Sequence, residues 1–266
     1  MDYLIKMLYQ IFFGTYDKLR SFLEVVIDRG LSVQERILTW QNRLLLAEHL
    51  IFATFGISLF WNDSWAWDIT SIFGYGISLK IWVYYYLYIC RYAVQIKKLT
   101  GEEKDYTSSL IHHVSTILLL SLSLQRWHRV GVMIGVVHDV ADIPLQMAKI
   151  CHKKYTLTSN RIYNYLSYPL FIIFSVVFFL TRILFNYRVI NYMYLVIFNP
   201  SNGNFFNQIL LAEVGVVGKI LYFLLFVNLS LQIFWQLMIF KFFYMMIVMG
   251  EASDEKEGTY QFRKTK

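Results

Sequence analysis

Long runs of apolar residues, separated by short polar stretches, dominate the chain. A helix needs about 20 predominantly apolar residues to cross the hydrocarbon core of a bilayer. Runs that meet this requirement predict six membrane-spanning helices, at residues 42–61, 69–95, 106–125, 130–150, 163–186 and 216–247. The pattern therefore predicts an all-α polytopic membrane protein whose membrane domain covers residues 32–250.

The segments outside these runs predict other structures. Residues 1–31 hold two apolar pieces that are too short to cross a membrane and are interspersed with basic residues, which is typical of an amphipathic segment lying in the interface. Residues 251–266 are rich in charge and predict a disordered cytosolic tail. Residues 189–198 end at Asn199-Pro200 and are compatible with a re-entrant or interfacial hairpin.

Composition and charge agree with a membrane location. The residues are 57% hydrophobic, and the mean hydropathy of +0.44 is too high for a soluble domain of this length. The net charge of +7 is spread over short loops, so lipid head groups and topology explain it better than a nucleic-acid partner. Lysines follow the second and fourth predicted spans, and residues 62–68 contain no Lys or Arg, so the positive-inside rule places both termini in the cytosol. The sequon at Asn62 would then be lumenal, but it lies too close to the membrane for us to expect its use.

Two groups of titratable residues interrupt the third and fourth predicted spans. They are His112 with His113, and His138 with Asp139 and Asp142. Such groups are costly at bilayer depth, so we expect them to be functional. His112 lies about six residues from the cytosolic start of its helix and Asp142 about eight from the cytosolic end of the next, which at ~1.5 Å per residue gives similar depths. The two groups are therefore predicted to meet in one site that opens toward the cytosol.

Three imidazoles and two carboxylates in a pocket poor in water predict acyl transfer. A carboxylate bonded to one ring nitrogen of a histidine fixes the tautomer and raises the basicity of the other nitrogen. Such an imidazole can deprotonate an amine, or attack a thioester itself and form an acyl-imidazole. These residues could instead be ligands of zinc or non-haem iron. The six histidines, however, do not form the repeated histidine boxes of membrane di-iron enzymes. No metal is therefore expected.

Other polar residues admit a plainer interpretation. The lysines at the cytosolic rim could hold the phosphates of coenzyme A, although each is as readily explained as a determinant of topology. These rim lysines are Lys97, Lys98, Lys149, Lys153 and Lys154. His49 and His152 are expected to form hydrogen bonds between helices, and His128 to lie at the membrane interface.

The order and spacing of these residues resemble the Lag motif of ceramide synthases, which are members of the TLC-domain superfamily. The matching segments are His112-His113-Val114-Ser115-Thr116, Arg129-Val130-Gly131, His138-Asp139-Val140-Ala141-Asp142 and Ala148-Lys149. Trp40-Gln41-Asn42-Arg43, Thr181-Arg182 and Gln232-Ile233-Phe234-Trp235 extend the resemblance over residues 32–258. Two segments depart from the family pattern: Lys104-Asp105-Tyr106 is a reduced form of the stretch before the His pair, and Gln146 stands where a glutamate is common.

The resemblance implies a six-helix TLC-type bundle or barrel in the endoplasmic reticulum membrane. It implies an enzyme that transfers the acyl group of fatty acyl-coenzyme A to the amine of a sphingoid long-chain base, without a separate cofactor. His112 is then the candidate for an acyl-histidine intermediate, with His113, His138 and Asp139 as base or orienting groups and Asp142 in support. The residues expected to bind the substrates are Ser115, Thr116, Arg129, Lys149 and Arg182. Membrane lipids, and a second copy of the chain or a small regulatory membrane subunit, are the expected partners.

Two other functions stay open. A non-enzymatic TLC-type lipid sensor or regulator of membrane composition would keep the helical bundle, but we expect such a relative to lack part of the His and Asp set. A proton-coupled transporter could use the same residues as a relay. Neither repeat symmetry nor a pair of broken helices supports a transporter.

Overall fold

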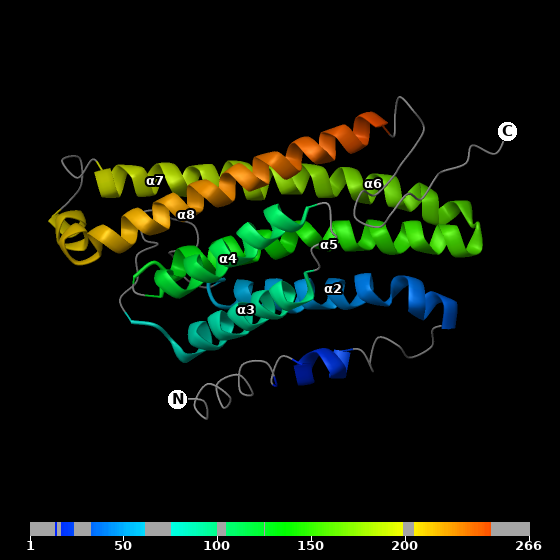
Figure 1. Ribbon diagram of the computed structural model, residues 1–266, viewed down its shortest axis with the longest axis horizontal. Helices are drawn as coiled ribbons and strands as arrows, with labels where there is room; N and C mark the ends of the chain where they lie inside the picture. The colour runs from blue at the N-terminus through cyan, green and yellow to red at the C-terminus, as the bar shows by residue number, and fades with distance from the viewer. Residues whose placement is uncertain are drawn as a thin grey trace.

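The computed structural model describes residue 14 and residues 17–23, 33–61, 76–99, 105–124, 126–198 and 205–245 (Figure 1). Its elements in chain order are α2 (Val33–Ser58), α3 (Leu79–Lys98), α4 (Tyr106–Ser123), α5 (His128–Thr158), α6 (Arg161–Phe178), the π-helix η3 (Phe179–Phe185), α7 (Asn186–Phe198) and α8 (Phe205–Tyr244). The described part of the chain is thus helical, without strands, and the all-α prediction is confirmed for it.

Three of the described helices are long and apolar enough to cross a membrane. They cover His128–Thr158, Arg161–Leu195 and Gly215–Tyr244, which correspond to the fourth, fifth and sixth predicted spans. For the other three predicted spans, and hence for a six-helix bundle, membrane crossing stays a prediction. Most of residues 1–31, the sequon at Asn62 and the tail 251–266 lie outside the described residues.

The long helices lie side by side, with α5 in the middle of the molecule (Figure 1). α5 packs against α2 on one side and α6 on the other, while α8 packs against α4 and α7. A tight turn joins α5 to α6: Ser159 adopts the left-handed conformation, with φ of 54°, and the side chain of Asn160 accepts a hydrogen bond from the backbone N–H of Ile162. A left-handed residue and an N-cap asparagine end one helix and start the next, so α5 and α6 become neighbours.

Residues 189–198 do not form the re-entrant or interfacial hairpin that the sequence suggested. They belong to α7, which continues α6 through η3 without a break. The physical reason is the absence of helix breakers, because the chain has neither Gly nor Pro between Pro169 and Pro200. α5 is also longer than its predicted span, since its polar C-terminal end stays helical to Thr158.

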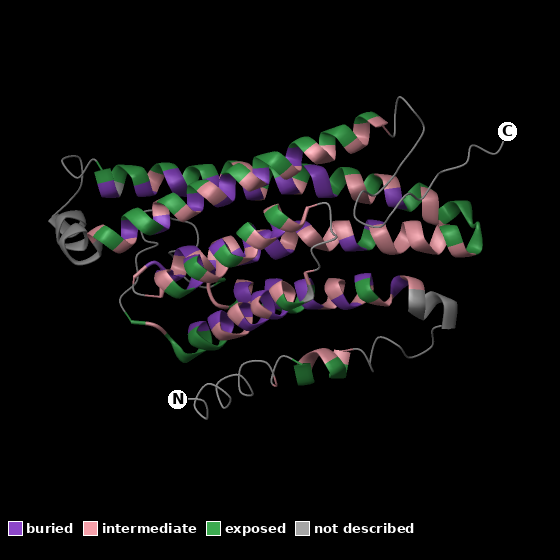
Figure 2. Ribbon diagram, viewed as in Figure 1, coloured by how far each residue is buried: buried purple, intermediate pink, exposed green. Residues whose placement is uncertain are grey.

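A seam of tyrosines fixes α3 against α5. Tyr84 and Tyr85 are fully buried, and they face Gly131 and Gly135 of α5 in the interior that Figure 2 shows between the helices. A Cβ added at Gly131 would lie 1.9 Å from the hydroxyl oxygen of Tyr85, and one at Gly135 would lie 2.7 Å from that of Tyr84. Small residues four apart on one helix let a neighbouring helix approach closely. The close approach of α3 to α5 also brings Arg91 of α3 into the interior, where it is buried.

Candidate active site

A cavity of about 1010 Å³ lies among the helices and is lined by residues of α2, α3, α4, α5, α6, η3 and α8. Its volume is at the upper end of the roughly 300–1,000 Å³ that is typical of small-molecule sites. The five residues predicted to act in catalysis all line it: His112, His113, His138, Asp139 and Asp142. The two polar groups therefore meet in one site, as their positions along the helices predicted, while their catalytic role stays a prediction.

Aromatic rings surround the histidines of α4. The ring of His112 stacks on that of His138, with centroids 6.1 Å apart and planes 17° apart. Trp235 of α8 meets His112 edge-on, with centroids 5.1 Å apart, and Tyr92 of α3 lies 5.3 Å from the ring of His113. The imidazoles are thus held by packing from helices distant in sequence, which restricts their orientation.

The tautomer of His138 is set by its two hydrogen bonds. Nδ1 lies 2.7 Å from the carbonyl oxygen of Ile134, which can only accept, so Nδ1 carries the hydrogen. Nε2 then accepts from the side-chain amide of Gln232 at 3.2 Å, and Gln232 also donates to Oδ1 of Asn228 at 3.1 Å. A backbone carbonyl and an amide of α8 orient His138, where we had expected a carboxylate.

Asp139 instead orients His49, which thereby forms the hydrogen bond between helices that we expected of it. Its Oδ1 accepts from Nδ1 of His49 and from Nη1 of Arg91, each at 2.7 Å. Its Oδ2 accepts from the hydroxyl of Tyr88. With three donors from two other helices, this buried carboxylate is a fixed acceptor that ties α2 and α3 to α5.

Arg182 connects η3 to the second carboxylate. Its Nη2 lies 2.7 Å from Oδ2 of Asp142 and donates to the backbone carbonyl of His138 at 2.7 Å, while its guanidinium stands 4.8 Å above the ring of Phe178. Arg182, which we expected to bind substrate, thus pairs with an acidic residue of the protein itself, and its role in binding stays a prediction. π-Helical turns occur often at functional sites, and this one places a buried arginine in the cavity wall.

The ion network extends to Glu48 on α2. Its carboxylate lies 3.7 Å from Nε of Arg91 and 3.9 Å from Nη1 of Arg20, and only 3% of its side chain is exposed. Buried charges are stable when they are paired and hydrogen-bonded. These ion pairs therefore join α2, α3, α5 and η3 in one network, of which Arg91, Asp139, Asp142 and Arg182 line the cavity.

The predicted lysines are divided by the structure. Lys149 and Lys153 line the cavity, as does Lys241, which the sequence did not single out. Nζ of Lys153 donates to Oδ1 of Asn42 at 2.9 Å. Lys154 lies 5.3 Å from the ring of Tyr163, and neither it nor Lys97 lines the cavity. The side chain of Lys98 lies outside the described residues.

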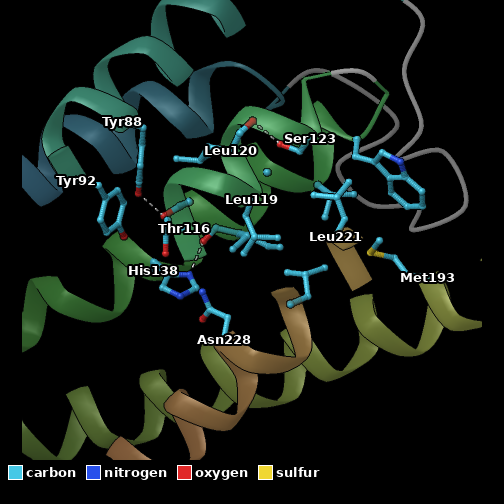
Figure 3. A pocket seen from close by; sticks show the side chains of 16 residues that line it. Tyr88, Tyr92, Thr116, Leu119, Leu120, Ser123, His138, Met193, Leu221 and Asn228 are labelled. Carbon is cyan, nitrogen blue, oxygen red and sulfur yellow. Dashed lines mark hydrogen bonds between the residues drawn. The ribbon is translucent and has the colours of Figure 1, made fainter. Parts of the chain in front are cut away.

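Other predicted substrate-binding residues do not reach this cavity. The hydroxyls of Ser115 and Thr116 donate to the backbone carbonyl of His112, at 2.9 and 2.7 Å. Thr116 lines a second cavity of about 40 Å³ (Figure 3). His138 and Tyr92 line both this cavity and the large one. Ser115 and Arg129 line neither cavity.

Sequence reasoning missed several residues of this wall. Arg91 lies in the second predicted span, and His49 lies in the first, next to the buried Glu48 behind the wall. The cost of a charge at bilayer depth applies to each of them and could have identified them. Gln232 could not be identified by the cost of a charge, because its amide is neutral and could form a hydrogen bond with many other groups. Only its place in the motif pointed to it.

Comparison with known proteins matches residues 39–241 to the family model of the TLC domain. Human ceramide synthase 5 is 32% identical over 142 residues, which are 51% of this chain and 34% of that protein. Human ceramide synthase 3 is 30% identical over 151 residues, 52% of this chain and 36% of that protein. Bovine ceramide synthase 4 is 29% identical over 164 residues, 58% and 35% of the two chains. The chain thus spans about a third of the length of these relatives.

Proposed function

The chain belongs to the TLC-domain family, and from this premise we propose that it is an acyl-coenzyme A-dependent N-acyltransferase of the ceramide synthase type. Its substrates are a fatty acyl-coenzyme A and a sphingoid long-chain base. The observation that carries the proposal is the single cavity in which His112, His138 and the Asp139–Asp142 pair meet. The relatives named as ceramide synthases supply the choice of substrate class.

The walls of the cavity suit both halves of an acyl-coenzyme A. Aromatic and aliphatic side chains of α6 and α8, among them Phe174, Phe234 and Met238, offer an apolar surface to a hydrocarbon chain. Lys149, Lys153 and Lys241 offer ammonium groups to phosphates. These two chemistries at one site support a substrate with a long apolar tail and an anionic carrier.

His112 is the residue that we assign to the acyl group. Its ring nitrogen attacks the thioester carbonyl, a C–N bond forms, the C–S bond breaks, and the ring proton leaves with the sulfur as the thiol. The amine then attacks the acyl-imidazole, the amide C–N bond forms, and the imidazole leaves with a proton from the amine. Stacking against His138 and Trp235 holds the ring of His112 in the geometry for attack.

A microsome assay with a labelled sphingoid base tests the proposal. The wild-type chain should form labelled ceramide from at least one acyl-coenzyme A, and His112→Ala should not. Product formation by His112→Ala at the wild-type rate would contradict the role of His112. A wild-type chain that is inactive over a range of bases and acyl lengths would contradict the function itself.

The location and partners belong to the same proposal. We place the protein in the endoplasmic reticulum membrane, as the resemblance to ceramide synthases implies. We place both termini in the cytosol, because the loop lysines follow the positive-inside rule. A second copy of the chain or a small regulatory membrane subunit is the proposed protein partner. A non-enzymatic lipid sensor is not favoured, because the chain retains the complete His and Asp set.

A further inference from the structure

His49 is a histidine of the cavity wall to which the proposed function gives no role. It projects from α2 into the same cavity as His112 and His138. We propose that His49 and Asp142 form the subsite for the amine: Asp142 binds the ammonium group of the incoming base, and Nε2 of His49 takes its proton. This assignment rests on the proposed N-acyltransferase function and adds to it a site for a primary ammonium group.

The contacts of His49 fix which ring nitrogen is basic. Nδ1 lies 2.7 Å from Oδ1 of Asp139, and an ionised carboxylate can only accept, so Nδ1 carries the hydrogen. Nη2 of Arg91 also contacts the ring, 2.9 Å from Nδ1 and 3.5 Å from Nε2, so the carboxylate of Asp139 is the nearer partner of Nδ1. With the hydrogen on Nδ1, Nε2 is the ring nitrogen that offers a lone pair, and it lies 3.7 Å from Oδ2 of Asp142.

Asp142 is the carboxylate of the network that a ligand in the cavity can reach. Its side chain is 23% exposed, whereas that of Asp139 is 2% exposed. A carboxylate at the edge of an apolar cavity attracts an ammonium group strongly, because opposite charges interact more strongly where the dielectric constant is low. An ammonium group on Asp142 brings its nitrogen next to Nε2 of His49.

The competing explanation is that His49 only neutralises the carboxylates. Each carboxylate already has a guanidinium partner at 2.7 Å, since Arg91 pairs with Asp139 and Arg182 with Asp142. His49 is thus not needed as a counter-ion for either carboxylate. The charged and titratable groups around it are Glu48 on α2, Tyr88 and Arg91 on α3, Asp139 and Asp142 on α5, Arg182 on η3 and, from α4 in the same cavity, His112 and His113.

His138 is less suited to this task than His49. Both of its ring nitrogens have partners, the carbonyl of Ile134 at 2.7 Å and the amide of Gln232 at 3.2 Å. A base must offer a lone pair to the incoming proton, and on His138 that lone pair is engaged by an amide hydrogen. The division of labour is then His112 for the acyl group and His49 for the amine.

The proton transfer completes the reaction without a further co-reactant. The ammonium group gives one proton to Nε2 of His49 and becomes a free amine. The amine attacks the acyl carbon, the amide C–N bond forms, and the bond to the acyl donor breaks. The second amine proton leaves with that donor, and the proton on His49 passes to water.

Two acceptors of equal chain length separate this role from a structural one. The first is the sphingoid base, whose amine is protonated at neutral pH, and the second is an O-alkyl hydroxylamine, whose nitrogen is not. We expect His49→Gln to lower kcat/KM for the base about 100-fold at pH 7. The deficit should shrink about tenfold per pH unit as the free amine accumulates. The same variant should use the hydroxylamine at the wild-type rate.

Two more variants complete the test. His152→Gln replaces another histidine that lines the cavity, farther along α5, and it should keep the wild-type pH profile with both acceptors. Asp142→Asn should raise KM for the base and leave KM for the uncharged hydroxylamine unchanged. Equal losses with both acceptors in His49→Gln, or no loss with the base, would overturn the assignment. A wild-type enzyme inactive with both acceptors would overturn the proposed function, and this subsite with it.

Discussion

Nδ1 of His49 and Oδ1 of Asp139 lie 2.7 Å apart although 90 residues separate them in the chain. Arg91, on a third helix, pairs with the same carboxylate, with its Nη1 2.7 Å from Oδ1 of Asp139. Both side chains are buried, so each depends on its partner for most of its polar contact. Because Asp139 contacts both residues, the geometry of the cavity wall depends on how α2, α3 and α5 are aligned.

Breaking the Asp139–Arg91 pair from one side should be costly. We expect Asp139→Leu to lower the free energy of unfolding by up to about 3–5 kcal/mol, because the buried guanidinium of Arg91 then keeps only the more distant carboxylate of Glu48, at 3.7 Å. The double variant Asp139→Leu with Arg91→Leu should lose less than the sum of the two single variants. Unfolding of the detergent-solubilised protein measures both effects. Additive losses would show that the two side chains do not stabilise each other.

The amide of Gln232 should matter for turnover. Gln232→Leu removes the hydrogen bond to Nε2 of His138, which is worth about 1 kcal/mol, so kcat should fall by about fivefold. Gln236, one turn farther along α8, is also buried and donates to Ser175, so Gln236→Leu is the matched control. Equal effects of the two substitutions on kcat would contradict the role assigned to Gln232.

The glycines that face the tyrosine seam should resist substitution. Gly131→Ala places a methyl group against the hydroxyl of Tyr85 and should destabilise the protein by about 1–3 kcal/mol. Gly215→Ala is the control, since nothing lies within 4 Å of the added carbon. Because the clash is with the hydroxyl, Tyr85→Phe should restore part of the stability of Gly131→Ala. The measured quantity is the thermal midpoint, and no recovery would contradict the seam as described.

The lysines of the cavity wall should affect the anionic substrate selectively. Lys241→Gln should raise KM for acyl-coenzyme A by up to about fivefold, which corresponds to about 1 kcal/mol, and leave KM for the base unchanged. The effect should weaken as salt is added. Lys154→Gln, which changes a lysine outside the cavity wall, provides the comparison. An equal rise of KM in Lys154→Gln would show that the effect reflects general surface charge.

The sequence was sufficient to predict that His112 lies in the same site as His138 and Asp142. Both groups lie on consecutive helices, and the helical repeat together with distance from the cytosolic ends placed them at one depth. The helical class followed from the apolar runs in the same way. These inferences needed only local spacing and the expectation that consecutive helices are neighbours.

Contacts between distant helices were beyond the same reasoning. Gln232 reaches His138 across 94 residues, and Arg91 reaches Asp139 across 48. A helical repeat tells which residues share a face, but not which other helix that face meets. Asp139 was thus expected to orient a histidine of the motif, whereas the packing of α2 against α5 gives it His49.

The π-helix η3 adds one residue to a turn within the otherwise α-helical rod of α6 and α7. Each residue turns an α-helix by about 100°, so the extra residue sets the angular phase of everything that follows it. Val189, Ile190, Met193 and Ile197 face the core at that phase. Loss of one residue between 179 and 185 would rotate this apolar stripe out of the core, so the chain length of this short stretch is constrained as well as the identity of Arg182.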